Sequence, residues 1–333
     1  MRAKKMRQDG AAEFISASFS PIYYAYQSLW LFLRTKTVML KQYIVTGAAG
    51  FLGCNLVERL MREDDAHIYA VVRPDSPHNA RIVDSEQCTL VFADLAEYAH
   101  LDKLIGEPCD VFFHLAWQGA RDDFSIQYGN IVHTLSALEA AARLGCHRFI
   151  CTGSQAEYGR QTQLITEATC PHPGDAYGAA KLAACALSRV RAAELGIEWI
   201  WGRVFSLYGK YEQEGRMLPA LAESLREGKP FALSSTGTQN WDYLYAADAA
   251  DALLALVERG RTGEIYNIAH GDYRPLHDFI AEAQRTIAPN AAVSYGEGTG
   301  NFSLQASVDK LRRDTGWQPT TGFIEGLCRG YLL

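Results

Sequence analysis

The sequence lacks the cysteine and histidine patterns of disulfide frameworks and metal sites. Its eight cysteines are scattered, with no C-x-x-C pair and no Cys/His cluster at ligand spacing, and its nine histidines form no H-x-x-x-H motif. We therefore expect reduced, mostly buried thiols, a cytoplasmic location and no metal. The cysteines are Cys54, Cys88, Cys109, Cys146, Cys151, Cys170, Cys185 and Cys328.

An excess of basic residues is also missing. The chain has 32 Lys and Arg against 38 Asp and Glu, a net charge of −6, whereas a protein that grips nucleic acid needs a basic docking face. No low-complexity tract interrupts the 333 residues, of which 48% are hydrophobic and 21% charged. This composition is typical of a globular protein and excludes disordered, collagenous and coiled-coil classes.

The first 38 residues differ from the remainder. They hold six basic and two acidic residues, a balance of +4 that leaves −10 for the rest. Residues 14–33 are uncharged and long enough to span a bilayer, but Pro21 and four serines weaken that interpretation, and the aromatic residues suit a membrane interface better. We expect residues 1–38 to be a disordered tail or an artefact of an upstream start, with Met39 as the natural start. Membrane contact through 14–33 is the less favoured alternative.

From Gln42 onwards, short apolar runs alternate with amphipathic stretches. Runs that are apolar throughout are typical of parallel strands covered by helices on both faces. The pattern predicts an α/β fold with a Rossmann-type, doubly wound parallel sheet over residues 39–205 and a smaller C-terminal substrate-binding lobe over 206–333, with segments near 240–270 returning to the first domain. The predicted strands are 43–46, 67–72, 89–93, 111–115, 148–152 and 198–204, and the predicted helices are near 52–63, 126–144, 177–195, 217–226, 247–258 and 276–287.

A glycine-rich turn, TGAAGFLG at 46–53, follows the first predicted strand and opens a helix. Glycines permit a tight turn and let backbone amides approach a pyrophosphate, which the helix N-terminus also favours. In this strand–turn–helix context the motif predicts a dinucleotide site. Its cofactor-binding residues are expected to be Gly47, Gly50, Phe51, Leu52 and Gly53.

The ends of the next strands suggest which dinucleotide binds. The second strand ends at Arg73, where an NAD enzyme would carry an acidic residue for the ribose 2′-hydroxyl. A guanidinium holds a 2′-phosphate, so NADP(H) is favoured and NAD(H) remains possible. Asp94 and Leu95 are expected near the adenine, and Leu115, Ala116 and Trp117 near the phosphates and ribose.

Tyr177 and Lys181 stand four residues apart, on one face of a predicted helix. A free tyrosine hydroxyl, with a pKa of about 10, is a poor proton shuttle at neutral pH, but a nearby ammonium stabilises its phenolate. Ser154, just past the fifth strand, is placed to bind a reacting carbonyl or alkoxide. The three residues together predict hydride-transfer chemistry.

These motifs resemble the extended short-chain dehydrogenase/reductase family, in its nucleotide-sugar branch, from about Met39 to the C-terminus. The resemblance rests on TGAAGFLG, Asp94-Leu95, HLAW at 114–117, GSQAEYG at 153–159, YGAAK at 177–181 and the segments 203–209, 241–245 and 311–319. It implies that Ser154, Tyr177 and Lys181 are catalytic. It also implies that Tyr177 and Lys181, together with Asn130 and Phe205, help to bind the cofactor. It also implies a homodimer formed through the helices at 126–144 and 177–195.

Departures from the family pattern reduce the number of family activities that we expect for this chain. Family 4,6-dehydratases carry an Asp-Glu pair as acid and base where this chain has Gln155 and Ala156, which argues against dehydration. Glu157 lies one position after the one that the glutamate of the family pair occupies. Trp241 replaces a pyrophosphate-binding arginine, so Arg216 or Arg312 is expected to take that role, and Ser206 replaces the usual asparagine. Gln155, Ser206, Arg216, Trp241 and Arg312 are therefore the predicted substrate-binding residues.

The stretch GSQAEYG, together with NWDYLY, looks most like reductases of nucleotide-linked 4-keto-6-deoxyhexoses in surface-polysaccharide pathways. We expect an NADPH-dependent 4-ketoreductase in which Tyr177 is the proton donor. The first alternative is a nucleotide-sugar 4-epimerase that retains NAD. A less favoured alternative is a non-catalytic NADP-binding scaffold.

Overall fold

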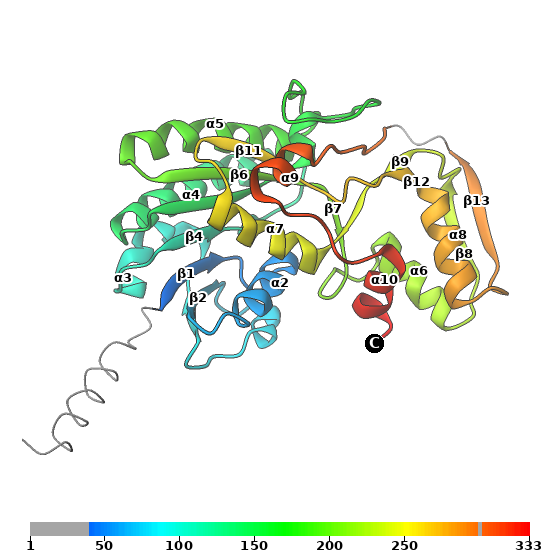
Figure 1. The fold of residues 1–333 in the computed structure, drawn as a ribbon, viewed down its shortest axis with the longest axis horizontal. Helices are drawn as coiled ribbons and strands as arrows, with labels where there is room; N and C mark the ends of the chain where they lie inside the picture. Colours follow the sequence, from blue (N-terminus) through cyan, green and yellow to red (C-terminus); the bar gives the residue numbers. More distant parts are fainter. Residues whose placement is uncertain (1–39, 299–301) are drawn as a thin grey trace, which may run out of the picture. The chain divides into compact units, whose positions relative to one another are not determined.

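Seven parallel strands form the central sheet of the computed structural model, which describes residues 40–298 and 302–333 (Figure 1). The strand order is β11-β6-β5-β4-β1-β2-β3. Strand β1 lies inside the sheet, and the chain runs from it outward through β2 and β3. The chain then returns to β4, on the other side of β1, and runs outward through β5, β6 and β11. The sheet is therefore doubly wound, as predicted. Its strands are β1 (Lys41–Thr46), β2 (Ala66–Val72), β3 (Cys88–Phe92), β4 (Val111–His114), β5 (Arg148–Ser154), β6 (Glu198–Val204) and β11 (Glu264–Ile268).

Helices cover both faces of this sheet because successive side chains of a strand point to opposite sides. On β1, Val45 lies in a core formed with α2 and α7, whereas Ile44 lies in a second core formed with α4 and α5. Both side chains are fully buried, which explains the unbroken apolar runs. The covering helices are α2 (Phe51–Leu60), α3 (Leu101–Ile105), α4 (Phe124–Arg143), α5 (Ala176–Leu195), α7 (Ala246–Arg259) and α9 (Asp309–Thr315), with short 3-10 helices η1 (Pro77–Arg81), η2 (Leu95–His100) and η3 (Gln155–Tyr158).

A smaller lobe follows β6. Three of its helices pack on one another around a core that includes Leu221, Ile280 and Leu327. Three pairs of short strands complete the lobe, and one of them, β7 with β10, leads back toward α7. The helices are α6 (Met217–Arg226), α8 (Leu276–Ile287) and α10 (Phe323–Tyr331), and the strand pairs are β7 (Ser206–Tyr208) with β10 (Tyr243–Tyr245), β9 (Asn240–Trp241) with β12 (Arg274–Pro275), and β8 (Phe231–Ser235) with β13 (Val293–Gly298).

The chain returns from this lobe to the sheet. After β10, α7 packs against α2, and β11 then pairs in parallel with β6, with Glu264 opposite Ile200 and Ile268 opposite Val204. Two segments from the second half of the chain thus belong to the central layers.

The predicted strands and helices are confirmed to within three residues at each end. Strand 198–204 and helices 217–226 and 276–287 have the predicted bounds. The seventh strand, β11, lies outside the predicted set because Glu264 and Asn267 interrupt its apolar run.

The predictions for residues 1–38, including the uncharged stretch 14–33, lie outside the described residues. Within the part of the chain that the structure describes, no helix has both the length and the apolar character needed to cross a membrane.

Candidate active site

The glycine-rich turn forms a tight backbone cradle between β1 and α2. Gly47 has a φ of 70°, in the left-handed region, and the Gly50 amide donates to the Gly47 carbonyl at 2.9 Å. A Cβ at Gly53 would lie only 2.1 Å from the Gly47 oxygen, and a Cβ at Gly47 would lie 2.9 Å from the Ala116 backbone. The turn therefore requires glycine, and its closeness to the N-terminus of α2 fits a pyrophosphate.

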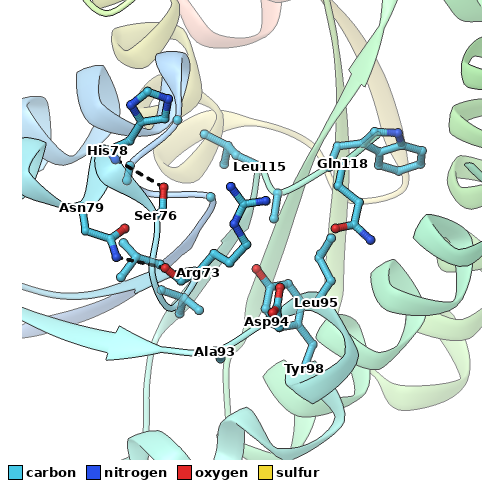
Figure 2. Close-up of a pocket in the computed structure, with 17 residues that line it drawn as sticks. Arg73, Ser76, His78, Asn79, Ala93, Asp94, Leu95, Tyr98, Leu115 and Gln118 are labelled. Carbon is cyan, nitrogen blue, oxygen red and sulfur yellow. Dashed lines mark hydrogen bonds between the residues drawn. The ribbon is translucent and has the colours of Figure 1, made fainter. Parts of the chain in front are cut away.

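A cavity of about 230 Å³ opens beside this turn, at the carboxyl ends of β1 to β4. Figure 2 shows the Arg73 side chain extending into it between Asp94 and Leu115. Ligands of doubly wound sheets bind at this edge. The structure brings together eight of the predicted cofactor residues along the cavity: Gly47, Gly50, Arg73, Asp94, Leu95, Leu115, Ala116 and Trp117.

Three further polar residues line the cavity near Arg73 and were missed by the sequence analysis. They are Ser76, His78 and Asn79, in and just before η1. The Asn79 side chain donates to the Arg73 carbonyl at 2.9 Å, and Ser76 accepts from the His78 amide at 3.3 Å (Figure 2). A Ser-Pro pair after a strand is a helix-start signal that would have indicated this turn.

A buried histidine joins the ends of β1 and β4. His114 Nδ1 lies 2.9 Å from the Thr46 hydroxyl, and its Nε2 lies 3.2 Å from the Thr134 hydroxyl, which donates to the Asn130 carbonyl. Because the Thr134 proton is engaged in that bond, Nε2 donates to the Thr134 hydroxyl. Burial lowers the pKa of His114 to about 3, and the positive charge of Lys181 adds to that effect. This network fixes the backbone on which the glycine turn rests.

Two predicted cofactor residues lie behind the cavity. Asn130 is 1% exposed, and its side chain accepts from the Gln118 amide at 3.3 Å and donates to the Gln118 carbonyl at 2.9 Å. It holds the loop that lines the cavity, and we correct its direct role to a supporting one. Leu52 is partly buried against the core formed with α2 and α7. It lines neither this cavity nor the two cavities described below.

A second cavity, of about 540 Å³, reaches from the end of β5 into the lobe. Its walls combine residues of both parts of the chain, as a substrate cleft between a sheet and a lobe requires. Predicted residues on these walls are Phe51, Ser154, Tyr177, Phe205, Ser206, Arg216 and Trp241, and Glu212, Gln213 and Tyr243 join them.

Tyr177 and Lys181 are held at the start of α5. The helix begins after Asp175, whose side chain accepts from the Gly178 amide at 2.7 Å. Lys181 is buried, donates to the Thr152 carbonyl at 2.6 Å, and has its ammonium 3.8 Å from the centre of the Trp117 ring. Trp117 also meets the Tyr177 ring edge-to-face at 6.1 Å. The Trp117 ring thus contacts both residues, a role that the sequence does not show.

Glu157 is fully buried beneath Ser154. One carboxylate oxygen accepts from the Ser154 amide at 2.8 Å and from the Trp201 indole at 2.9 Å, and the other accepts from Arg203 at 2.7 Å. Both carboxylate oxygens of Glu157 thus accept hydrogen bonds from groups inside the protein. Glu157 therefore supports the end of β5 and is not placed to act on a substrate.

The two remaining predicted substrate residues, Gln155 and Arg312, differ in whether they line a cavity. Gln155, which follows Ser154 in the sequence, lines a third cavity of about 400 Å³. Arg312 lies exposed on α9, 3.6 Å from Asp309, and borders none of the three cavities, whereas Arg216 lines the second cavity. Over residues 40–298 and 302–333, no group of three or more His, Cys, Asp or Glu side chains is arranged to hold a metal ion.

Comparison with known families gives a match over most of the chain. Residues 43–269 match the family described as the NAD dependent epimerase/dehydratase family. Among individual proteins, the chain is 25% identical to the dTDP-glucose 4,6-dehydratase of Neisseria meningitidis, covering 86% of this chain and 91% of that protein. It is 24% identical to the dTDP-D-glucose 4,6-dehydratase of mouse, covering 86% of each.

Solved structures share the fold. The UDP-glucuronic acid 4-epimerase of Bacillus cereus, in complex with NAD, superposes with a TM-score of 0.77 at 24% identity, covering 87% of this chain and 97% of that one. RMD from Pseudomonas aeruginosa, complexed with NADPH, superposes with a TM-score of 0.74 at 22% identity and the same coverage.

Proposed function

Because the chain belongs to the NAD dependent epimerase/dehydratase family, an enzyme family of the extended short-chain dehydrogenase/reductase type, we propose that it reduces the C4 keto group of a nucleoside-diphosphate 4-keto-6-deoxyhexose. The relatives named above are, by name, enzymes that act on nucleotide sugars. The nicotinamide cofactor supplies the hydride when bound, and the protein supplies the proton and the positioning.

The cofactor is NADP(H) in this proposal. The glycine cradle and the cavity beside it fit a dinucleotide, and Arg73 extends into that cavity (Figure 2). Among the lining residues that the structure describes, Asp94 is the only carboxylate, and it follows β3, not β2. The end of β2 therefore offers a cation for a 2′-phosphate and, among the described lining residues, no carboxylate for a 2′-hydroxyl.

Ser154, Tyr177 and Lys181 carry the reaction. As hydride reaches C4, the carbonyl oxygen becomes an alkoxide, and the Tyr177 hydroxyl donates its proton to that oxygen. The Ser154 hydroxyl orients the same oxygen, since Ser154 and Tyr177 line one cavity. Lys181 lies one helical turn from Tyr177, on the same helix. Ser206, Arg216 and Trp241 hold the nucleotide sugar in the same cavity.

The observation that favours reduction over dehydration is the absence of a carboxylate after Ser154. Gln155 cannot exchange a proton as an acid does, and Ala156 is a buried methyl group. The next residue, Glu157, has both oxygens occupied by Ser154, Trp201 and Arg203. Elimination of water needs a general acid and a general base, and neither is available at these positions.

We also propose a homodimer. Helices α4 and α5 pack against each other and expose large apolar side chains that a monomer leaves in water: Phe124, Tyr128, Val132, Leu187 and Val190. Spacings of three and four residues place them along one stripe of each helix. A second copy of the same pair covers them as a four-helix bundle.

The test is NADPH oxidation at 340 nm with a panel of nucleotide-linked 4-keto-6-deoxyhexoses, beside an assay for cofactor bound to the purified protein. Stoichiometric NADPH loss with one keto sugar supports the reductase and identifies its nucleotide. No oxidation, together with tightly bound NAD and interconversion of two C4 epimers, overturns it in favour of a 4-epimerase.

A further inference from the structure

A third cavity, of about 400 Å³, adjoins the residues proposed to react. Gln155, on its wall, directly follows Ser154, and Asp175 precedes Tyr177 by two residues. Arg121, also on its wall, has its guanidinium 4.5 Å from the centre of the Tyr177 ring, and its carbonyl accepts from the Tyr177 amide at 3.0 Å. A group in this cavity is therefore close to a sugar held at Ser154 and Tyr177.

The carboxylate on the cavity wall is already occupied. Asp175 is the only carboxylate among the described lining residues. Its Oδ2 accepts from Arg121 Nε at 2.9 Å and from Nη2 at 2.7 Å, and its Oδ1 accepts from the Gly178 amide at 2.7 Å. No oxygen of this side chain is left without a donor.

Donors, by contrast, remain free. Within the described residues, no side-chain hydrogen bond or ion pair engages the Arg160 guanidinium or the Gln155 amide, and Arg121 Nη1 has no bond to Asp175. Two guanidinium groups face one carboxylate, so the lining carries a net charge of +1. A complementary ligand must therefore bring acceptor oxygens and negative charge.

We infer that this cavity binds a carboxylate carried by the sugar of the substrate, with Arg160 as its principal ligand and Gln155 beside it. The inference rests on the proposed function for the nucleotide sugar itself. In a 6-deoxyhexose, C6 is a methyl group, so the carboxylate belongs to a substituent of the ring. Arginine is suited to this role because its planar fork matches both oxygens of a carboxylate.

The test uses N-acetylmuramate and its methyl ester as a matched pair of probes that differ in whether a ring substituent carries a free carboxylate. Ligand-observed saturation-transfer NMR on the full chain, with NADP+ at saturation to fill the cofactor cavity, should show the acid binding at least about 10-fold more tightly than the ester. Arg160→Leu should weaken binding of the acid about 10-fold and leave binding of the ester unchanged. Arg329→Leu, which removes an exposed arginine outside the cavity, should change neither.

Equal binding of the two probes to the wild type, or unchanged binding of the acid in Arg160→Leu, overturns the inference. Because the readout requires no turnover, a failure of keto-sugar reduction leaves this result standing. Loss of the preference for the acid in an enzyme that still oxidises NADPH leaves the proposed reduction standing.

Discussion

The carboxylate of Glu157 accepts the main-chain amide of Ser154 at 2.8 Å, three residues before it in the chain and directly above it in the fold. The same side chain binds Arg203 at 2.7 Å, and both partners are almost completely buried. The ion pair thus fixes the backbone of the proposed catalytic serine from inside the protein.

Glu157→Gln should lower the free energy of unfolding by about 3–5 kcal/mol, because it leaves the Arg203 charge buried without a counter-charge. Urea unfolding measures this loss. The control is Glu198→Gln, which breaks the half-exposed pair with Arg148 and should cost less, about 1 kcal/mol. The double variant Glu157→Leu with Arg203→Met should recover much of the stability. If it is as unstable as Glu157→Gln, the loss does not come from an unpaired charge.

Arg73→Ser should raise the KM for NADPH about 10- to 100-fold, since a charge-assisted contact to a 2′-phosphate contributes about 1.5–3 kcal/mol. The KM for NADH, which lacks that phosphate, should stay nearly constant. Arg81→Gln is a matched control, because Arg81 lies on the same loop but stacks on Tyr211, outside the cavity lining. Equal losses for both cofactors would show that Arg73 acts only through the structure of the loop.

Tyr177→Phe should reduce turnover of the keto sugar about 100-fold or more, because the proton donor is removed while the ring is kept. Cofactor affinity, measured by fluorescence titration, should remain within about twofold. Tyr128→Phe, an exposed tyrosine on α4, is the control for loss of a hydroxyl. Unchanged turnover in Tyr177→Phe contradicts the proposed role.

His114 should make the protein less stable as the pH falls from about 6 to 4. The folded protein keeps this ring neutral, since burial lowers its pKa to about 3, whereas the unfolded chain takes up a proton near pH 6.5. Protons therefore favour the unfolded state in that window, with a slope of about 1.4 kcal/mol per pH unit.

His114→Gln should remove that slope, as measured by urea unfolding at each pH. Asp242 contributes with the opposite sign, because burial raises its pKa from 3.8 to about 6 despite hydrogen bonds from the His270 and Gly271 amides. The difference between wild type and variant isolates the histidine. Parallel curves for the two proteins would exclude the neutral His114 as the source.

Val190→Glu should shift the protein from dimer to monomer in sedimentation velocity experiments. Val190 is 62% exposed on α5, within the apolar stripe shared with α4. A charge there leaves carboxylates without counter-charge in the proposed bundle. Val83→Glu changes a valine that is 75% exposed and lies outside these helices, and this variant should remain dimeric. A monomeric wild type contradicts the proposed dimer directly.

Local pattern was sufficient to predict six of the seven strands, because each of these six is an apolar run. It was also sufficient for the first turn, where the glycines have a steric reason visible in the motif. The same holds for the position of Tyr177 and Lys181 on one helix face. Such features depend on neighbours within a few residues.

Contacts between residues far apart in the sequence could not be predicted from local pattern. Glu157 meets Trp201 and Arg203 only because β5 pairs with β6, with Gly153 opposite Arg203. Asn130 appears in the sequence as one more cofactor residue, and its actual partner, Gln118, is set by the packing of α4 under the loop after β4. Arg312 was chosen for its charge alone, and α9 places it away from the cavities. Pairing register and helix packing decide these roles, and neither is encoded in spacing.

The position of β11 has a consequence for synthesis of the protein. β6 is complete at residue 204, yet its neighbour β11 begins only at residue 264. Until then a growing chain presents the backbone groups of β6 as an unpaired edge, which other strands can join. In the finished fold, Lys310 closes the next edge by binding the Ile265 carbonyl and Glu264. The nascent protein therefore carries this open strand edge for the synthesis of about 60 further residues.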